Sequence, residues 1–498
     1  MRRLWCVWTL WATGCGQALG KRAPDDVPLR ALADKAGLVV GAAVSWEPLQ
    51  QDPGYAALAA RHFHVLTPEN ALKWAPIEHT EGARDTRRID DIARFAARNG
   101  QSLRGHTLVW DLEIPSWVDT ADAHALDAAL VSHMRATLSE NRGRVGVWDV
   151  VNEALADDGQ RAPTVLHNAL GEPHIAQAFR LARAEDPDAK LFYNDYGVLW
   201  PGPKADGLLR LVDSLQAQDV PIDGVGLQSH VHLVPEGRLD HAGIRANLKR
   251  LGERGLELHL SEVDVRVADL AGGHTGRLLA QAQAVYGLVD ACLDEPACTT
   301  VTFWGISDRY SWVDRTIGPD DPLLWDDDLV PKPALFAVQD ALRGKPWRGC
   351  SDSLLDGSFE AGAAGFSSTG GRASVERGGT SEGRHRLVVT DRTEAWHGPQ
   401  VDASEWLAEG LDYRISAKVK VPKGAPVNAT LRIEDAAGTR YVSVAAAQGT
   451  GAWQALSGVV ALDLHAPVGS VHWYVEGPPP GQDIELDGVV ATVACPSG

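Results

Sequence analysis

The chain has 498 residues, which is enough for two or three domains or for one large barrel with a smaller module. Its 66 acidic and 47 basic residues give a formal net charge of −19, the wrong sign for binding a phosphate backbone, so nucleic acid is not an expected partner. With 44% hydrophobic and 23% charged residues, the composition excludes disordered and collagen-like chains. The 17 tryptophans outnumber the 8 tyrosines and 8 phenylalanines, and such flat rings suit sugar faces as well as cores.

The amino-terminal 20 residues have the order of a secretory signal. Two arginines at positions 2 and 3 precede a short apolar run over residues 4–12, and small residues follow. The apolar run is too short to span a bilayer. Residues 12–15 resemble a bacterial lipobox in which Ala12 replaces the usual Leu. We therefore expect export, either as a secreted protein cleaved near Gly20 or as an outer-surface lipoprotein with a lipid anchor on Cys15.

Four cysteines remain outside this segment, and their even number in an exported chain predicts two disulfides. Cys292 and Cys298 would close a very short loop. Cys350 and Cys495 would join the two ends of the last module. The alternative, four unpaired buried thiols, is less typical outside a reducing compartment.

Residues 21–348 alternate short apolar runs with helical segments, the pattern of βα units around a parallel sheet. The eight strand candidates are 38–44, 62–67, 102–109, 146–151, 190–193, 224–227, 256–260 and 299–304, and helix candidates between them include 89–99, 123–140, 173–185 and 276–293. Eight strands favour an α/β fold of the (β/α)8 TIM barrel type over a doubly wound sheet. No glycine-rich phosphate motif follows the first strands, so nucleotide binding is not indicated.

Residues 349–498 have a different pattern. Short β-branched runs with period-two alternation are separated by Gly, Pro and Asp turns, at 386–390, 413–421, 429–434, 441–445, 470–476 and 484–493. This pattern predicts an all-β sandwich of the jelly-roll type.

Polar side chains gather where seven of the eight barrel strands end, the face on which barrel enzymes place their sites. Among them, Glu153 and Glu262 each end an apolar strand, so both are expected in one polar pit. A glycosidic bond needs such a pair, because the leaving oxygen gains a proton while the anomeric carbon gains a nucleophile. A spacing of about 5–5.5 Å predicts retention and about 6.5–9.5 Å predicts inversion. The rival interpretation is a metal site that includes His106 and His230, but the sequence shows none of the usual metal-ligand spacings. A serine hydrolase is not indicated either, because the sequence has no G-x-S-x-G motif.

These residues lie in segments that resemble the signatures of glycoside hydrolase family 10, the retaining endo-β-1,4-xylanases. The segments occur in the family's order as TPENALKWAPIE, RGHTLVW, WDVVNEAL, YNDYG, GVGLQSHVH, LSEVDV and FWGISDRYSWV. The resemblance implies that Glu153 is the general acid/base and Glu262 the nucleophile, with no cofactor for catalysis. It also implies sugar subsites lined by Glu69, Asn70, Lys73, Asn152, Gln228, His230 and Trp304. Trp110 is a further substrate-binding candidate, and Trp312 and Trp325 are either sugar platforms or rim packing, with Trp312 preferred as a substrate-binding residue.

Chemical roles follow for two of these residues. Asn152 can hydrogen-bond the sugar 2-hydroxyl, an interaction that strengthens toward the oxocarbenium-like transition state. His230 could orient Glu262 and partly neutralise it. The sequence departs from the family after the third strand, where Asp111 and Glu113 replace the usual His and Gln. Extra negative charge raises carboxyl pKa values, which predicts a pH optimum shifted upward. His106 taken alone is interpreted as structural.

The last module resembles carbohydrate-binding module families 4, 9 and 22 through DGSFE, DRTEAWHGPQVD, WYVEG and IELD. The resemblance implies sugar contacts by Trp396 and Glu476, and Tyr474 alternates onto the same strand face as Glu476. A buried sandwich Trp is the alternative for Trp396. The resemblance to these module families also implies that Glu360 and Asp487 hold a structural calcium, because carboxylates supply the hard oxygen ligands that calcium prefers.

The sequence thus predicts a retaining endo-1,4-β-xylanase with xylan as its partner. No protein partner is evident, and a monomer is expected. Two alternatives stay open: the same mechanism on another β-1,4-glycan, and a polysaccharide-binding protein that does not cut.

Overall fold

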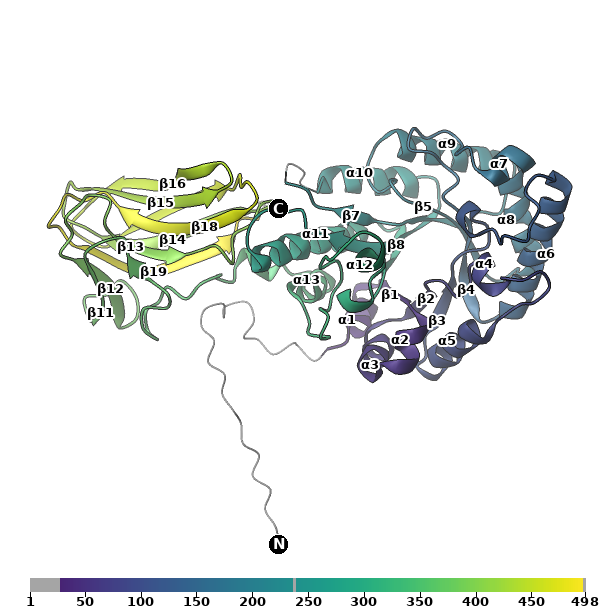
Figure 1. Ribbon diagram of the computed structural model, residues 1–498, viewed down its shortest axis with the longest axis horizontal. Helices are drawn as coiled ribbons and strands as arrows, with labels where there is room; N and C mark the ends of the chain where they lie inside the picture. Colours follow the sequence, from purple (N-terminus) through teal and green to yellow (C-terminus); the bar gives the residue numbers. More distant parts are fainter. Residues whose placement is uncertain (1–26, 236–238, 496–498) are drawn as a thin grey trace, which may run out of the picture. The chain divides into compact units, whose positions relative to one another are not determined.

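The computed structural model describes residues 27–235 and 239–495, which form two compact units (Figure 1). One unit holds the described residues up to 269 together with 278–347. The other holds 348–495 together with 270–277, a short segment that the sequence pattern assigns to the barrel. The expected signal segment 1–20 and Cys15 lie outside the described residues. No helix in the described ranges combines the length and apolarity that a membrane crossing requires.

The first unit is a closed barrel of eight parallel strands, which confirms the TIM-barrel prediction. Neighbouring strands follow the order β6-β5-β4-β3-β2-β1-β9-β8, and parallel pairing of β6 with β8 closes the ring. A short strand, β7, pairs with the far part of β8. The strands are β1 (Val39–Val44), β2 (Val65–Pro68), β3 (Ser102–Gly105), β4 (Val145–Asn152), β5 (Lys190–Asp195), β6 (Gly224–Leu227), β7 (His230–His232), β8 (Glu257–Arg266) and β9 (Cys298–Phe303).

Helices surround the strand ring (Figure 1). They are α1 (Leu29–Ala36), α2 (Trp46–Gln51), α3 (Pro53–His62), α4 (Trp74–Ile77), α5 (Arg87–Arg98), α6 (Ala123–Asn141), α7 (Val165–Leu170), α8 (Pro173–Glu185), α9 (Pro203–Ala217), α10 (His241–Gly252), α11 (His274–Asp294), α12 (Trp312–Thr316) and α13 (Pro333–Leu342), with 3-10 turns η1 (Asp111–Glu113), η2 (Asp308–Tyr310) and η3 (Arg348–Cys350).

Three strand boundaries differ from the sequence prediction. Strand β3, predicted to run to 109, ends at Gly105, and Val109 makes only an isolated parallel bridge with Val151 on β4. Strand β2 begins at Val65 because α3 continues through His62, held at its start by the Asp52 carboxylate, which accepts from two backbone N–H groups. Strand β8 runs well beyond residue 260, because Glu262 and Asp264 are buried within it rather than placed in a loop. A polar side chain on a barrel strand can lie in a polar pit, so its polarity alone does not mark the end of the strand.

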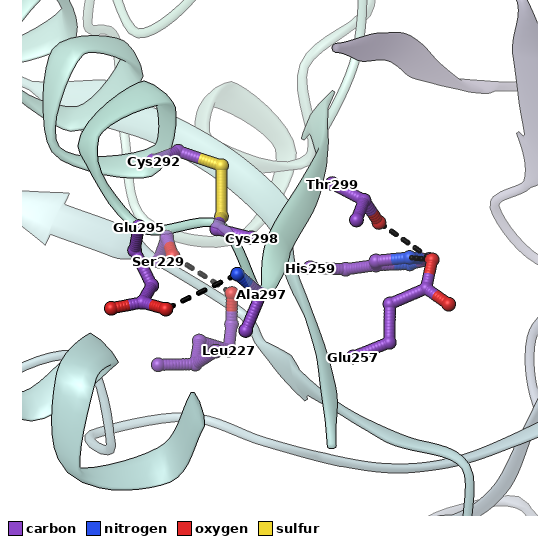
Figure 2. Close-up of a disulfide and its surroundings, with 9 residues drawn as sticks. All are labelled: Leu227, Ser229, Glu257, His259, Cys292, Glu295, Ala297, Cys298 and Thr299. Carbon is purple, nitrogen blue, oxygen red and sulfur yellow. Dashed lines mark hydrogen bonds and ion pairs between the residues drawn. A yellow bond between two sulfur atoms is a disulfide. The ribbon is translucent and has the colours of Figure 1, made fainter. Parts of the chain in front are cut away.

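Both predicted disulfides are present. Cys292 near the end of α11 bonds Cys298 at the start of β9, with a Cα–Cα distance of 5.1 Å (Figure 2). The Glu295 side chain accepts from the Ala297 N–H at 3.1 Å in the same short loop (Figure 2). Cys350 in η3 bonds Cys495, close to the end of the second unit, with a Cα–Cα distance of 5.5 Å.

The second unit contains two five-stranded antiparallel sheets, as the sandwich prediction requires. Their orders are β10-β13-β18-β15-β16 and β11-β12-β19-β14-β17. The strands are β10 (Ser367–Ser368), β11 (Arg372–Arg377), β12 (His385–Thr390), β13 (Pro399–Asp402), β14 (Asp412–Lys420), β15 (Pro426–Asp435), β16 (Gly438–Gln448), β17 (Gln454–Ala461), β18 (Val468–Glu476) and β19 (Ile484–Val493). The sequence missed β10, β11, β13 and β17. Strand β11 has no fully buried face, and β10 and β13 are too short to show alternation.

Candidate active site

Glu153 follows the last residue of β4 in a constrained turn. Its φ of 57° lies in the left-handed region, which is uncommon for a residue other than glycine, and such backbone outliers cluster at functional sites. Its N–H donates to the Asn194 carbonyl oxygen on β5 at 3.0 Å, which fixes the turn. The carboxylate accepts hydrogen bonds from Gln228 Nε2 at 2.8 Å and from Trp110 Nε1 at 3.0 Å. Donors that follow β6 and β3 therefore hold this side chain in place.

Glu262 lies on β8 and is almost completely buried. Its Oε1 accepts from Asn194 Nδ2 at 2.7 Å, and its Oε2 lies 3.2 Å from His230 Nε2. His230 Nδ1 in turn lies 2.8 Å from Asp264 Oδ2, which also accepts from Trp312 Nε1 at 2.8 Å. The His230 ring is therefore held between two carboxylates.

This arrangement favours the ions. Burial alone would lower the pKa of His230, but the Asp264 carboxylate, with help from Glu262, raises it to about 10. Burial alone would raise the pKa of Glu262, yet the hydrogen bond from His230 and the charges of His106 and His230 outweigh burial, so the pKa of Glu262 is lowered. At neutral pH Glu262 is therefore an anion that accepts from an imidazolium, as a nucleophilic carboxylate needs.

Two asparagines and a glutamine link the carboxylates. Asn194 Nδ2, which donates to Glu262, also donates to Asn152 Oδ1 at 2.8 Å. Gln228 Nε2, which donates to Glu153, lies 3.4 Å from the same Asn152 oxygen. Both carboxylates thus belong to one hydrogen-bonded network at the carboxyl ends of β4, β5, β6 and β8. Asn152 Nδ2 is buried and has no partner among the described residues, so it is a donor ready for a sugar hydroxyl.

The residues after β2 and β3 extend this network. Lys73 Nζ donates to Asn70 Oδ1 at 2.8 Å and lies 4.8 Å from the centroid of the Trp110 ring, whose N–H binds Glu153. Glu69 accepts from the Ser45 hydroxyl and from Arg315 Nη2, the latter at 2.6 Å. These contacts place Asn70 and Lys73 beside Trp110 at the Glu153 end of the site, whereas Glu69 contacts Ser45 and Arg315.

Aromatic rings pack around the Glu262 end. The centroids of Trp304 and Trp312 lie 6.3 and 5.2 Å from that of His230. His106, interpreted as structural from the sequence, lies 5.2 Å from Trp304 by the same measure, and its Nδ1 is held by Asp149 Oδ2 at 3.1 Å. Because its ring packs against Trp304 and its Nδ1 is held by the buried Asp149, we assign it to the site. Trp325, by contrast, is 2% exposed and belongs to the packing.

The predicted set omitted four residues that the geometry brings in. Asn194 and Asp264 lie inside YNDYG and LSEVDV, so their place at strand ends was a usable signal. His106 lies within RGHTLVW and carried a similar signal. Arg315 gave none, because its approach to Glu69 depends on how the loops after β2 and β9 meet.

The two acidic substitutions differ in position. The Asp111 carboxylate accepts from the Leu166 N–H at 3.0 Å, in the first turn of α7. Glu113 is half-buried, with its carboxylate 3.9 Å from Lys73 Nζ. Burial raises the pKa of Glu113, against opposing effects of Lys73 and His106. Only Glu113 therefore adds charge beside residues of the site.

In the second unit, Trp396 is 53% exposed, which excludes a buried sandwich Trp. The Gly477 N–H donates to the Ala395 carbonyl oxygen at 2.9 Å and so places the Trp396 loop beside the end of β18, where Glu476 lies. Tyr474 is paired across the sheet with Thr430, whose hydroxyl donates to Glu476 at 2.9 Å. The sequence prediction missed Tyr441, which is 64% exposed on the adjoining strand β16.

The expected calcium ligands of this unit are engaged elsewhere. Glu360 Oε1 accepts from the His385 N–H at 2.9 Å, and Asp487 Oδ2 accepts from the Ser381 N–H at 2.8 Å. In the part of the chain that the structure describes, no group of three or more His, Cys, Asp or Glu residues could hold a metal ion. Each of the two carboxylates is thus held by a backbone N–H group.

Comparisons with known proteins agree with this geometry. A family profile described as "Glycosyl hydrolase family 10" matches residues 28–341, and one described as "Carbohydrate binding domain" matches residues 351–481. "Endo-1,4-beta-xylanase B" of Thermotoga neapolitana is 33% identical over 338 residues, covering 67% of this chain and 95% of that protein. "Endo-1,4-beta-xylanase C" of Phanerodontia chrysosporium is 36% identical over 321 residues, covering 63% and 79%. The crystal structure of xylanase 10B from Thermotoga petrophila RKU-1 in complex with xylobiose matches with a TM-score of 0.61 at 34% identity, covering 65% of this chain and 99% of that chain.

Proposed function

Because the chain belongs to glycosyl hydrolase family 10, we propose that it is a retaining endo-1,4-β-xylanase that hydrolyses internal β-1,4 xylosidic bonds of xylan. The observation that carries this proposal is the single network joining Glu153 and Glu262 across the carboxyl ends of the barrel strands. The proposed substrate is supported by the similarity of this chain to relatives that are named endo-1,4-beta-xylanases.

The proposed reaction has two displacements. The ionised Glu262 carboxylate attacks the anomeric carbon, the glycosidic bond breaks, and Glu153 gives its proton to the leaving oxygen. Glu153, now a carboxylate, takes a proton from water, whose oxygen displaces Glu262 and restores both residues. The free Asn152 N–H binds the 2-hydroxyl and stabilises charge as the ring flattens. Gln228 and Trp110 hold Glu153 in position.

The roles of the two carboxylates are tested with Glu153→Ala and Glu262→Ala. Glu262→Ala should be nearly inactive on all substrates. Glu153→Ala should lose most activity on substrates with poor leaving groups and regain part of it with azide, because the missing acid matters least when the leaving group departs easily. Glu81→Ala, an exposed change of the same kind, is the matched control. Equal losses for both variants on aryl xylobiosides and on xylan would contradict the assignment.

Substrate and stereochemistry are tested together. NMR should show the β-anomer as the first product from xylan. Faster release of reducing sugar from glucomannan or mixed-linkage glucan would favour the alternative glycan, and no release at all would favour a binding protein.

For the second unit we propose xylan binding through Trp396 and Glu476, with Tyr474, which is only 6% exposed, as a lesser contact. The exposed Trp396 ring beside Glu476 supports it. Trp396→Ala should weaken binding of the whole protein to insoluble xylan by about tenfold, while activity on short soluble substrates is unchanged. Trp453→Ala is the control, because Trp453 lies elsewhere in the unit, where its Nε1–H donates to the Gly379 carbonyl oxygen. Unchanged binding by the Trp396 variant would refute the role.

We further propose an exported monomer, secreted or anchored by a lipid on Cys15. The two disulfides support an oxidising compartment. Mass spectrometry of the native amino terminus separates cleavage from lipidation, and light scattering measures the mass in solution.

We also propose a structural calcium in the second unit, because Glu360 and Asp487 line one cavity of about 350 Å³. If the melting temperature is the same with EDTA as with added calcium, the calcium proposal is refuted.

A further inference from the structure

Two consecutive backbone N–H groups hold the turn that carries Glu153, and both donate to the end of β5. The Glu153 N–H donates to the Asn194 carbonyl oxygen, and the Ala154 N–H donates to the Tyr193 hydroxyl oxygen, each at 3.0 Å. The φ of Glu153 is 57°, a conformation that persists in a residue other than glycine only where its surroundings hold it. The Tyr193 side chain is therefore one of the two fixed points of this turn.

Tyr193 is held in turn by a buried ion pair. Tyr193 and Asp195 are completely buried, and Lys204, in the first turn of α9, is 4% exposed. The Tyr193 hydroxyl donates to Asp195 Oδ2 at 2.5 Å, and Lys204 Nζ lies 2.9 Å from Asp195 Oδ1. A phenol has one hydrogen to donate, and an ionised carboxylate can only accept. Asp195 therefore takes that hydrogen and leaves the lone pairs of the Tyr193 oxygen to the Ala154 N–H.

Lys204 keeps Asp195 in the ionised form. Burial raises the pKa of Asp195 to about 6, against the opposing effects of Lys204 and of the Tyr193 hydroxyl, so Asp195 is an anion at neutral pH. The helix dipole disfavours a lysine in the first turn of a helix, and burial of its ammonium is a further cost in free energy. Replacing such a buried pair by apolar residues of similar size often leaves stability unchanged or raises it. Stability alone therefore does not account for this pair.

The helix that carries Lys204 also packs against the loop that follows Glu153. Gly207 on α9 lies so close to Gly159 in that loop that an added Cβ would come within 2.3 Å of the Gly159 carbonyl oxygen. Arg210 Nη2, one turn further along α9, donates to the same oxygen at 3.1 Å. Helix α9 thus supports both the ion pair behind the turn and the loop that leaves it.

We propose that Tyr193, Asp195 and Lys204 are positioning residues for the acid/base Glu153. They act through the backbone of the turn, whereas Gln228 and Trp110 hold the carboxyl group itself. The inference rests on the proposed xylanase function and adds to it the residues that place its general acid. A general acid must lie within hydrogen-bond distance of the oxygen that it protonates. A displaced turn should therefore slow proton donation to the leaving oxygen without weakening sugar binding.

The test removes the Tyr193 hydroxyl from the whole protein with Tyr193→Phe. Tyr413→Phe is the matched control, because Tyr413 is equally buried and its hydroxyl accepts from the Ala408 N–H at 2.9 Å, but in the second unit. kcat/KM is measured on a dinitrophenyl β-xylobioside, whose leaving group departs without an acid, and on a phenyl β-xylobioside, whose leaving group needs one. The ratio of the two values does not depend on how much of the protein is folded.

Tyr193→Phe should lower kcat/KM on the phenyl substrate by about tenfold, the size of one lost hydrogen bond, and leave the value on the dinitrophenyl substrate unchanged. A ratio equal to that of Tyr413→Phe, or equal losses on both substrates, would overturn the proposal while leaving the xylanase function intact. If Glu153→Ala itself shows no dependence on the leaving group, or if the wild-type protein cleaves neither substrate, the proposed function fails instead. Should Tyr193→Phe not fold, Lys204→Met, which removes the ammonium from a side chain of similar length, decides by the same ratio.

Discussion

Replacing Asp264 by asparagine should remove the negative charge that keeps His230 protonated. The protonated His230 in turn keeps Glu262 ionised. Asp264 holds His230 Nδ1 at 2.8 Å, and the pKa of His230 is raised to about 10 even though burial opposes it. An ordinary histidine has a pKa near 6.5, and each pKa unit corresponds to about 1.4 kcal/mol, so the site favours the imidazolium by roughly 5 kcal/mol. Asparagine keeps the shape and one acceptor but removes the charge, so burial should then make His230 neutral near pH 7.

Neutral His230 would no longer give Glu262 a charge-assisted hydrogen bond, which is worth about 1.5–3 kcal/mol. The pKa of Glu262, now lowered, should therefore rise, and the acidic limb of kcat/KM on an aryl xylobioside should move up by about one to two pH units. Asp206→Asn, at an exposed ion pair with Arg250, is the control. An acidic limb that stays in place in a folded Asp264→Asn protein would refute the idea that His230 controls this ionisation.

Glu262 and His230 also make the free energy of unfolding depend on pH, one at the acidic end and the other at the alkaline end. The lowered pKa of Glu262 contributes stability that is present above its unfolded value of about 4.5 and lost as pH falls through the lower folded value. The raised pKa of His230 contributes stability that is complete below about 6.5 and lost as pH rises through about 10. Asp264→Asn should abolish most of the alkaline loss, as urea unfolding between pH 6 and 10 would show.

The two disulfides should differ in what they contribute to stability. Cys350–Cys495 closes 145 residues and Cys292–Cys298 closes 6, so replacing each pair by serine should cost about 5 and about 2 kcal/mol in the chain-entropy description, measured by urea unfolding; equal losses would contradict it. Glu113→Gln should move the pH optimum downward, whereas Asp111→Ala should leave it in place and destabilise the fold by about 1 kcal/mol, as the loss of a helix-terminal hydrogen bond does. A shift in the optimum with Asp111→Ala would show that its charge reaches the site.

Much of the fold could be predicted because local pattern and tertiary structure agree. Most barrel strands have apolar runs that the barrel buries on both faces, so the sequence predicted that these strands exist even where it did not predict their ends. Strand β11 could not be found, because both of its faces are partly exposed and it is defined by pairing with β12. Strand ends such as that of β8 depend on whether polar residues face a pit, which is a tertiary property.

The site was predictable to the extent that its members lie toward the carboxyl ends of barrel strands. Asn152 ends β4, Glu153 follows it and Glu262 lies in the second half of β8, so a closed barrel brings all three to one rim. The roles of His106 and Arg315 depend instead on side-chain neighbours from distant segments, His106 with Trp304 and Arg315 with Glu69. No spacing in the sequence encodes such contacts.

The acidic substitutions show how the structure changes an inference made from sequence. The sequence predicted one combined effect of the two added carboxylates on the pH optimum, because a sequence shows which residues are charged but not where their side chains point. The Asp111 carboxylate is directed to the first turn of α7, where the N–H groups and the helix dipole stabilise an anion. Glu113 instead lies 3.9 Å from Lys73, whose ammonium lies over the Trp110 ring that binds Glu153. Any upward shift of the optimum must therefore come from Glu113, and Lys73 reduces it by offsetting part of the added charge.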